Sequence, residues 1–116
     1  MKKTVPFKAF GQDDYLYFDI GKLVQLEQVT GKTVIELWDA SNSGKFGVDL
    51  IVKCLTVGLI DCRQNITEKQ VMAEISDAFE KGESLVSFIT PIFSALIESG
   101  IFGGKKATPA RKNVKE

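Results

Sequence analysis

The pattern of apolar and polar residues changes its period near residue 19. Before that point Val5, Phe7 and Ala9 alternate with Pro6 and Lys8, which is the period of a half-buried β-strand over residues 4–10. The turn sequence GQDD separates this strand from a second apolar run, YLYF. Proline cannot donate to a strand ladder, so the first strand belongs at an edge. The pattern predicts an N-terminal β-hairpin over residues 4–18, whose apolar face must be covered by other elements.

From residue 19 the apolar residues recur at helical spacing, and the boundaries carry capping signals. Asp19 is the expected N-cap of a first helix that ends near Val29, just before Gly31. A second helix begins at Thr33, with Glu36 three residues later as the partner in a capping box. The expected core-facing residues of these two helices are Ile20, Leu23, Val24, Leu26, Val34, Leu37 and Trp38.

Three further helices are expected after the loop at residues 41–44. Residues 48–60 are apolar nearly all round, which is typical of a central, buried helix. The sequence TEKQ at residues 67–70 is a second capping box, and Gly82 closes the helix that it opens. Residues 84–98 form a wide apolar stripe, in which Thr90-Pro91 predicts a kink or a restart. The expected apolar face of the 67–81 helix comprises Val71, Met72, Ile75, Ala78 and Phe79.

Together these elements predict a mainly α fold. We expect one globular domain over residues 1–102, with the hairpin at 4–18 followed by four or five packed helices at 19–102. Residues 103–116 are rich in Gly, Lys, Pro, Ala and Arg, and this composition predicts a disordered basic tail.

The sequence GKT at residues 31–33 raises the question of a phosphate-binding loop. That motif requires a further glycine five positions before the second one, where this chain has Leu26. It also leaves a strand and enters a helix, whereas Gly31 follows a predicted helix. The sequence therefore favours a turn between two helices over a nucleotide site.

Charge is balanced overall but unevenly distributed. Fifteen basic residues oppose fifteen acidic ones, and residues 100–116 carry +4 while residues 1–99 carry −4. A balanced chain has no overall field that attracts nucleic acid or membranes, so binding of either is not expected. The tail has two interpretations: a solvated end that keeps the protein soluble, or an arm that touches nucleic acid or an acidic partner.

Catalytic, cofactor and metal chemistry find no support in the residue types. The chain has no histidine, so the usual general base and commonest metal ligand are missing. Cys54 and Cys62 match no zinc or redox spacing; Cys54 is expected to be a buried hydrophobe, and no disulfide is expected. Asp13, Asp14 and Asp19 are expected in turn and cap roles rather than as cation ligands. Since these residues form no catalytic set, a non-enzymatic protein is expected. The start of the chain lacks a signal-peptide pattern and no apolar run has membrane length, so the protein is expected to be cytosolic.

The apolar stripe that ends at Phe102 is long for a chain of 116 residues. One interpretation is that the stripe closes the intramolecular core. The alternative is that part of it, especially Ile101-Phe102, contacts a partner or another subunit. Because of this apolar surplus, we also expect the protein to form a homo-oligomer.

The order of the motifs resembles one family. Tyr17-Phe18-Asp19 leads to Leu23, then to the segment LEQVTGKTVIEL at residues 26–37, and later to an apolar helix that ends in VGL at residues 57–59. This order is similar to the "FD…L..LE..TGK…EL" and "LL..L..GL" segments of tail assembly chaperones of long-tailed bacteriophages and related prophages. The similarity covers roughly residues 4–100.

The resemblance implies a non-enzymatic protein of the host bacterial cytoplasm that is not retained in the mature virion. Such a protein would bind the long tape measure protein, and possibly the tail-tube protein, and assist tail-tube assembly. The family motif fixes no binding residues, so the expected partner contacts come from the last apolar segment: Leu85, Phe88, Ile92, Phe93 and Phe102. Two alternatives remain open at this point: a phage structural component such as a head–tail connector or tail terminator, and a small nucleic-acid-binding regulator that uses the basic tail.

Overall fold

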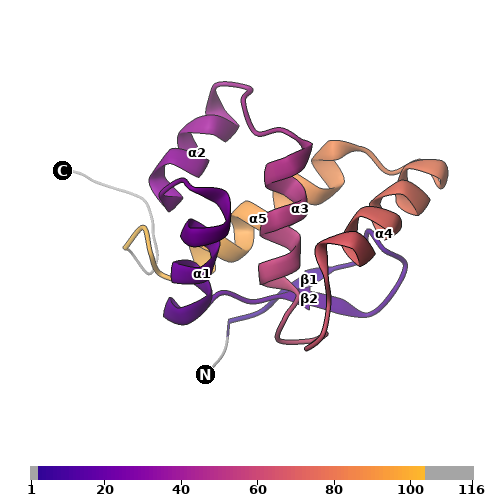
Figure 1. The fold of residues 1–116 in the computed structure, drawn as a ribbon, viewed down its shortest axis with the longest axis horizontal. Helices are drawn as coiled ribbons and strands as arrows, with labels where there is room; N and C mark the ends of the chain where they lie inside the picture. The colour runs from indigo at the N-terminus through magenta and orange to yellow at the C-terminus, as the bar shows by residue number, and fades with distance from the viewer. Residues whose placement is uncertain (1–2, 104–116) are drawn as a thin grey trace.

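A two-stranded antiparallel hairpin precedes five helices in the computed structural model, which describes residues 3–103 (Figure 1). This arrangement confirms the mainly α fold class. The predicted disordered tail lies outside the described residues, except for Gly103. The elements are β1 (Val5–Phe7), β2 (Asp14–Leu16), α1 (Ile20–Thr30), α2 (Val34–Asn42), α3 (Val48–Gly58), α4 (Glu68–Glu80) and α5 (Leu85–Glu98).

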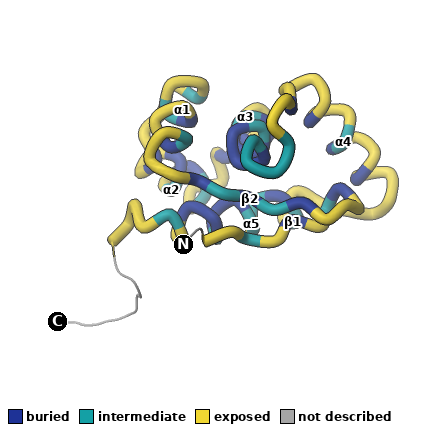
Figure 2. The backbone as a smooth tube through the Cα atoms, turned by 90° about the horizontal axis from the view of Figure 1, so that it is seen from below, coloured by how far each residue is buried: buried dark blue, intermediate teal, exposed yellow. Residues whose placement is uncertain are grey.

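Helix α3 occupies the centre of the fold. In Figure 1 it stands between α1 and α2 on one side and α4 on the other, with α5 crossing behind it. Figure 2 shows α1, α3 and α4 in one layer and the hairpin with α5 in the other. Helix α3 packs against α1, α4 and α5, and α5 also packs against β1. The prediction of a central helix is confirmed by its buried residues: Leu50, Ile51, Val52, Cys54, Leu55, Val57 and Gly58.

The hairpin tolerates a proline because of its register. Pro6 lies opposite Tyr15, and the backbone N–H of Tyr15 points away from β1, toward the Sγ atom of Cys62 at 3.5 Å. The N–H of Tyr17 points the same way and donates to the carbonyl of Gly58 at 3.0 Å. Pro6 therefore removes no hydrogen bond from the ladder and leaves no N–H on the outer edge of β1, as expected for an edge strand.

Helix α5 is continuous from Leu85 to Glu98, with Pro91 inside it. Of the two outcomes predicted at Thr90-Pro91, a kink or a restart, the restart is therefore wrong. A proline inside a helix costs about 3 kcal/mol, because it removes one backbone hydrogen bond and crowds the preceding turn. Burial of a large apolar side chain contributes about 1.5–3 kcal/mol. Phe88 before the proline and Ile92 and Leu96 after it are all fully buried, so tertiary packing on both sides holds the helix together.

Candidate partner-binding surface

The corner between α1 and α2 is closed by carboxylates. Gly31 adopts a left-handed backbone (φ 70°), and its N–H donates to the carbonyl of Glu27 at 2.9 Å. At the start of α2, the N–H of Thr33 donates to Oε1 of Glu36 at 2.8 Å, and the N–H of Val34 donates to Oε2 of Glu27 at 2.9 Å. A phosphate at this corner would have to displace two negative groups from the donors it needs. The geometry is that of a helix–turn–helix corner, as the sequence predicted.

The residues of the family-like segment at this corner have structural roles. Leu26 and Leu37 are fully buried, and the hydroxyl of Thr30 donates to the carbonyl of Leu26 at 2.8 Å. Thr33 and Glu36 form the capping box that the sequence predicted. These residues of the segment therefore specify how the two helices join.

The three N-terminal aspartates pair with nearby groups of the protein, and Asp13 and Asp19 lie at the surface. Asp13 pairs with Lys8, which lowers the pKa of the Asp13 carboxyl through a hydrogen bond and the lysine charge. Asp19 caps α1: its Oδ1 accepts from the N–H of Lys22 at 2.9 Å, and this bond lowers the pKa of Asp19. Among residues 3–103, no three His, Cys, Asp or Glu side chains are grouped so that they could hold a metal ion.

Asp14 belongs to an ion-pair network that sequence reasoning missed. It is buried, and its two carboxylate oxygens accept from Nε and an Nη atom of Arg63 at 2.9 and 2.8 Å. Arg63 also binds the carboxylate of Glu74 on α4, with one contact at 2.9 Å. Hydrogen bonds to Asp14 and Glu74 raise the pKa of Arg63. The network links three parts of the fold: the hairpin, helix α4 and the loop that follows α3. No local sequence signal joins Asp14 to Arg63, because they are 49 positions apart.

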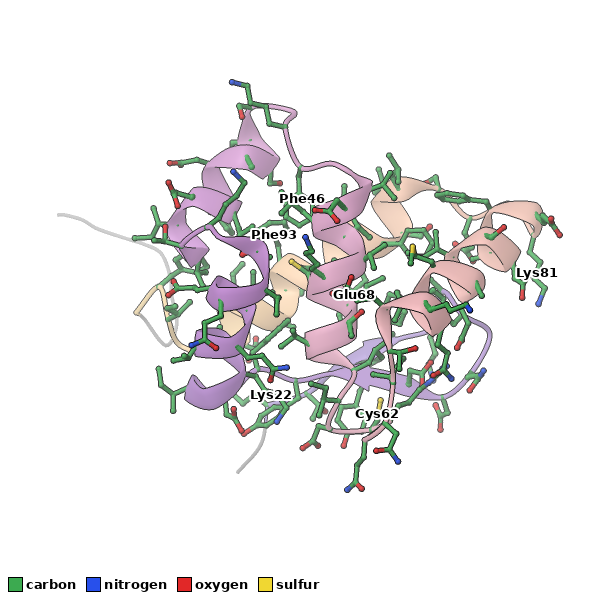
Figure 3. All side chains as sticks on the ribbon, viewed as in Figure 1. Lys22, Phe46, Cys62, Glu68, Lys81 and Phe93 are labelled. Atoms are coloured by element: carbon green, nitrogen blue, oxygen red, sulfur yellow. The ribbon has the colours of Figure 1, made fainter. Side chains whose placement is uncertain are left out.

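Both cysteines are reduced and neither is positioned as a nucleophile. Cys54 is fully buried, as expected, and burial raises its thiol pKa to about 12. Cys62 lies beside the hairpin (Figure 3), where its Sγ donates to the carbonyl of Tyr15 at 3.2 Å. Burial is also the main reason why the pKa of Cys62 is raised. Neither thiol is activated, because a reactive cysteine needs a lowered pKa.

Three of the five predicted partner-binding residues are buried in the core. Phe88 and Ile92 are fully buried and Phe93 is 8% exposed, so the prediction of surface contacts is corrected for these three. The ring of Phe93 packs between Phe46 at 5.1 Å and Trp38 at 5.7 Å, and Figure 3 shows Phe46 and Phe93 close together beside α3. The apolar stripe of α5 is wider than the part of the helix that contacts the core. The positions of the neighbouring helices decide which part of the stripe is covered.

The other two predicted residues, Leu85 and Phe102, are each 40% exposed. Leu85 opens α5 and, together with exposed apolar residues of α4 and of the first turn of α5, belongs to what we call the α4–α5 surface. Phe102 packs its ring against Trp38 at 5.0 Å and belongs to a second set at the other end of α5, the C-terminal apolar group. The α4–α5 surface comprises Met72, Phe79, Leu85 and Val86, and the C-terminal apolar group comprises Ile97, Ile101 and Phe102.

The sequence prediction placed two residues of the α4–α5 surface in the core, and this prediction is wrong. Met72 and Phe79 were expected in the core, but they are 51% and 40% exposed. The core contact of α4 is narrower than its apolar stripe and consists of Val71, Ile75 and Ala78. The ring of Phe79 lies 5.6 Å from that of Phe88, so this residue borders the core while one side faces solvent.

A hollow of about 180 Å³ lies between the hairpin and α4. It brings together carboxylates, an amide, an amine and apolar groups but no hydroxyl or thiol, so it offers no side-chain oxygen or sulfur nucleophile of the serine or cysteine kind. Its lining residues are Ala9, Phe10, Gln12, Glu74, Asp77, Ala78 and Lys81.

No helix within residues 3–103 has the length and apolar character needed to cross a membrane. Comparison with known proteins adds no further constraint: no protein-family model matches this chain, and neither a curated protein nor a solved structure shows significant similarity to it. The residues and surfaces described above are therefore the basis for any functional conclusion.

Proposed function

We propose that this protein is a tail assembly chaperone of a long-tailed bacteriophage or prophage, which binds the tape measure protein and assists tail-tube assembly without catalysing a reaction. The observation that carries the proposal is the ordered motif set at residues 17–37 and 57–59, which resembles that family. The chaperone acts in the host cytoplasm and leaves before the virion is complete.

The exposed apolar residues supply the chemistry that such a chaperone requires. A protein that keeps a long, aggregation-prone partner soluble must cover apolar side chains of that partner, and it needs no polarised catalytic group. The α4–α5 surface places Met72, Phe79 and Leu85 where they can contact a partner segment without unfolding the core. We assign this surface to the tape measure protein.

Co-expression tests the proposal. The tape measure protein encoded in the same genome is expressed with and without this chain, and the soluble fraction and the co-purified complex are measured. We expect Met72→Asp/Leu85→Asp to abolish co-purification, because both side chains are exposed and apolar. Ile20→Asp is the matched control, since Ile20 lies on α1, away from this surface. Ile20 and Val24 were predicted to face the core, but they are 77% and 48% exposed, because only Leu23 and Leu26 of α1 are buried. A tape measure protein that is equally soluble with and without the chain would contradict the proposal.

Purified phage particles distinguish the proposal from a structural role. A chaperone is absent from finished particles, whereas a head–tail connector or tail terminator is present at fixed stoichiometry. Detection of this chain in particles by mass spectrometry, at a constant ratio to the tail-tube protein, would favour the structural component instead.

A further inference from the structure

Two surfaces at opposite ends of the molecule are complementary in charge and in apolar character. Residues 68–86 contain five carboxylates and two lysines, a formal charge of −3, and Asp77, Glu80 and Glu83 are exposed there beside the apolar α4–α5 surface. The C-terminal apolar group precedes residues 104–116, which carry five basic residues and one acidic residue, a formal charge of +4. The two surfaces therefore carry opposite charge, and both expose apolar side chains.

We propose that the α4–α5 surface is covered by the C-terminal segment of a second copy of this chain, residues 97–116. Ile97, Ile101 and Phe102 contact the exposed apolar side chains, and the basic residues that follow pair with Asp77, Glu80 and Glu83. Apolar contact supplies most of the stability, and the opposite charges set the register and exclude like-charged alternatives.

The apolar part of this contact and its first two lysines cannot come from the same molecule. The described chain ends at the left of Figure 1, whereas the turn from α4 to α5 lies at the right, along a molecule 45 Å long. Figure 3 shows Lys81 at that right-hand end. Residues 104–116 span at most about 45 Å when fully extended, at about 3.3–3.6 Å per residue. Lys105 and Lys106 follow Gly103 almost directly, so they cannot reach Glu80 or Glu83 of their own copy.

A closed dimer satisfies both surfaces of each copy. The C-terminal segment and the α4–α5 surface lie at opposite ends of the molecule. Two copies placed side by side in antiparallel orientation therefore form the same contact twice, related by a two-fold axis. Two-fold dimers are the commonest closed assemblies among soluble proteins. This contact does not depend on the proposed chaperone function, although it covers the surface that we assign to the tape measure protein and therefore competes with that partner.

Sedimentation equilibrium of the full chain, without any other protein, tests the contact. The wild-type protein is expected to be a dimer at tens of micromolar in about 50 mM salt, and the dimer weakens in about 500 mM salt because exposed charges are screened. Glu80→Lys/Glu83→Lys is expected to raise the dimer dissociation constant at least about tenfold, because it reverses charge at the contact. Asp39→Lys, on an exposed position of α2, is the matched control and leaves the dimer unchanged. Far-ultraviolet circular dichroism confirms that every variant is folded.

Mixing two variants separates this contact from other modes of association. A tail variant with Lys105→Glu, Lys106→Glu, Arg111→Glu and Lys112→Glu is expected to dimerise more weakly than the wild type when alone, as is the Glu80→Lys/Glu83→Lys variant. In a mixture, the intact tail of one meets the intact surface of the other and a heterodimer forms. A monomeric wild type, an open-ended series of larger species, or a dimer indifferent to both sets of substitutions would overturn the proposal.

Discussion

The carboxylate of Glu27 on α1 accepts a hydrogen bond from the backbone N–H of Val34, the first residue of α2, at 2.9 Å. This bond spans the turn at Gly31 and makes the side chain of one helix a cap for the next. The start of a helix leaves its first N–H groups without helical partners, and a carboxylate there also interacts favourably with the helix dipole.

We expect Glu27→Ala to lower the free energy of unfolding by about 1 kcal/mol, since one cap of α2 is lost. Gln28→Ala, at the exposed neighbouring position, is the control and should leave the denaturation midpoint unchanged. Urea denaturation followed by circular dichroism measures both. Equal midpoints for the two variants would show that the bond contributes nothing to stability.

Nucleotides are expected not to bind at the GKT sequence. Because Glu27 and Glu36 already occupy the N–H groups of Val34 and Thr33, millimolar ATP or GTP with magnesium should leave the melting temperature unchanged. Lys32→Ala should behave like the wild type in the same assay, because Lys32 is exposed. A saturable rise in melting temperature that Lys32→Ala removes would contradict this expectation.

Gly58 lies where α3 meets the hairpin, and a larger residue does not fit. A Cβ atom on Gly58 would lie 2.9 Å from Cζ of Phe18 and 3.2 Å from Cδ2 of Leu16. We therefore expect Gly58→Ala to cost about 1–3 kcal/mol of stability through overpacking.

Gly21→Ala is the matched control for Gly58→Ala, and it should raise the stability of the fold instead of lowering it. Gly21 lies within α1, where an added Cβ meets nothing closer than Oδ1 of Asp19 at 3.5 Å. Alanine in a helix is favoured over glycine by about 0.5–1 kcal/mol. Thermal unfolding should separate the two variants, and destabilisation by both would rule out the steric explanation.

Arg63→Met is expected to be among the most damaging substitutions outside the apolar core. It leaves the carboxylate of Asp14, which is 7% exposed, without its bidentate partner. Breaking a buried ion pair from one side costs about 3 kcal/mol. Adding Asp14→Asn should recover part of this loss, because it removes the uncompensated charge. The exposed pair between Lys8 and Asp13 supplies the control, and Lys8→Met should leave the unfolding midpoint unchanged.

Because Asp19 is the N-cap of α1, the free energy of unfolding should vary with pH in the acid range. The N–H of Lys22 holds the pKa of Asp19 below its ordinary value of 3.8. A carboxyl with a lowered folded-state pKa contributes stability above its unfolded pKa and loses it as the pH falls through the folded pKa. Asp19→Asn keeps a good capping side chain without the titration. The difference in stability between wild type and Asp19→Asn should shrink from about pH 5 to about pH 2. A constant difference across that range would contradict the assignment.

The amino-acid sequence by itself determined the local structure. The capping residues Asp19, Thr33 and Thr67, the turn at Gly31 and the proline of the edge strand all lie where the sequence placed them. These features depend on atoms only a few residues apart, so their signals are contained in short segments. The rejection of a phosphate loop at residues 31–33 rests on the same local reasoning.

Only the tertiary structure decided which apolar residues are covered and which charges meet. Phe88 is buried while Leu85, three residues earlier on the same helix, is exposed, because only part of a wide stripe faces α3 and the hairpin. Asp14, Arg63 and Glu74 come from separate segments, and the packing of both the hairpin and α4 against α3 brings them together. Helical period shows which side chains share a face, but the position of neighbouring helices decides how much of that face remains available to a partner.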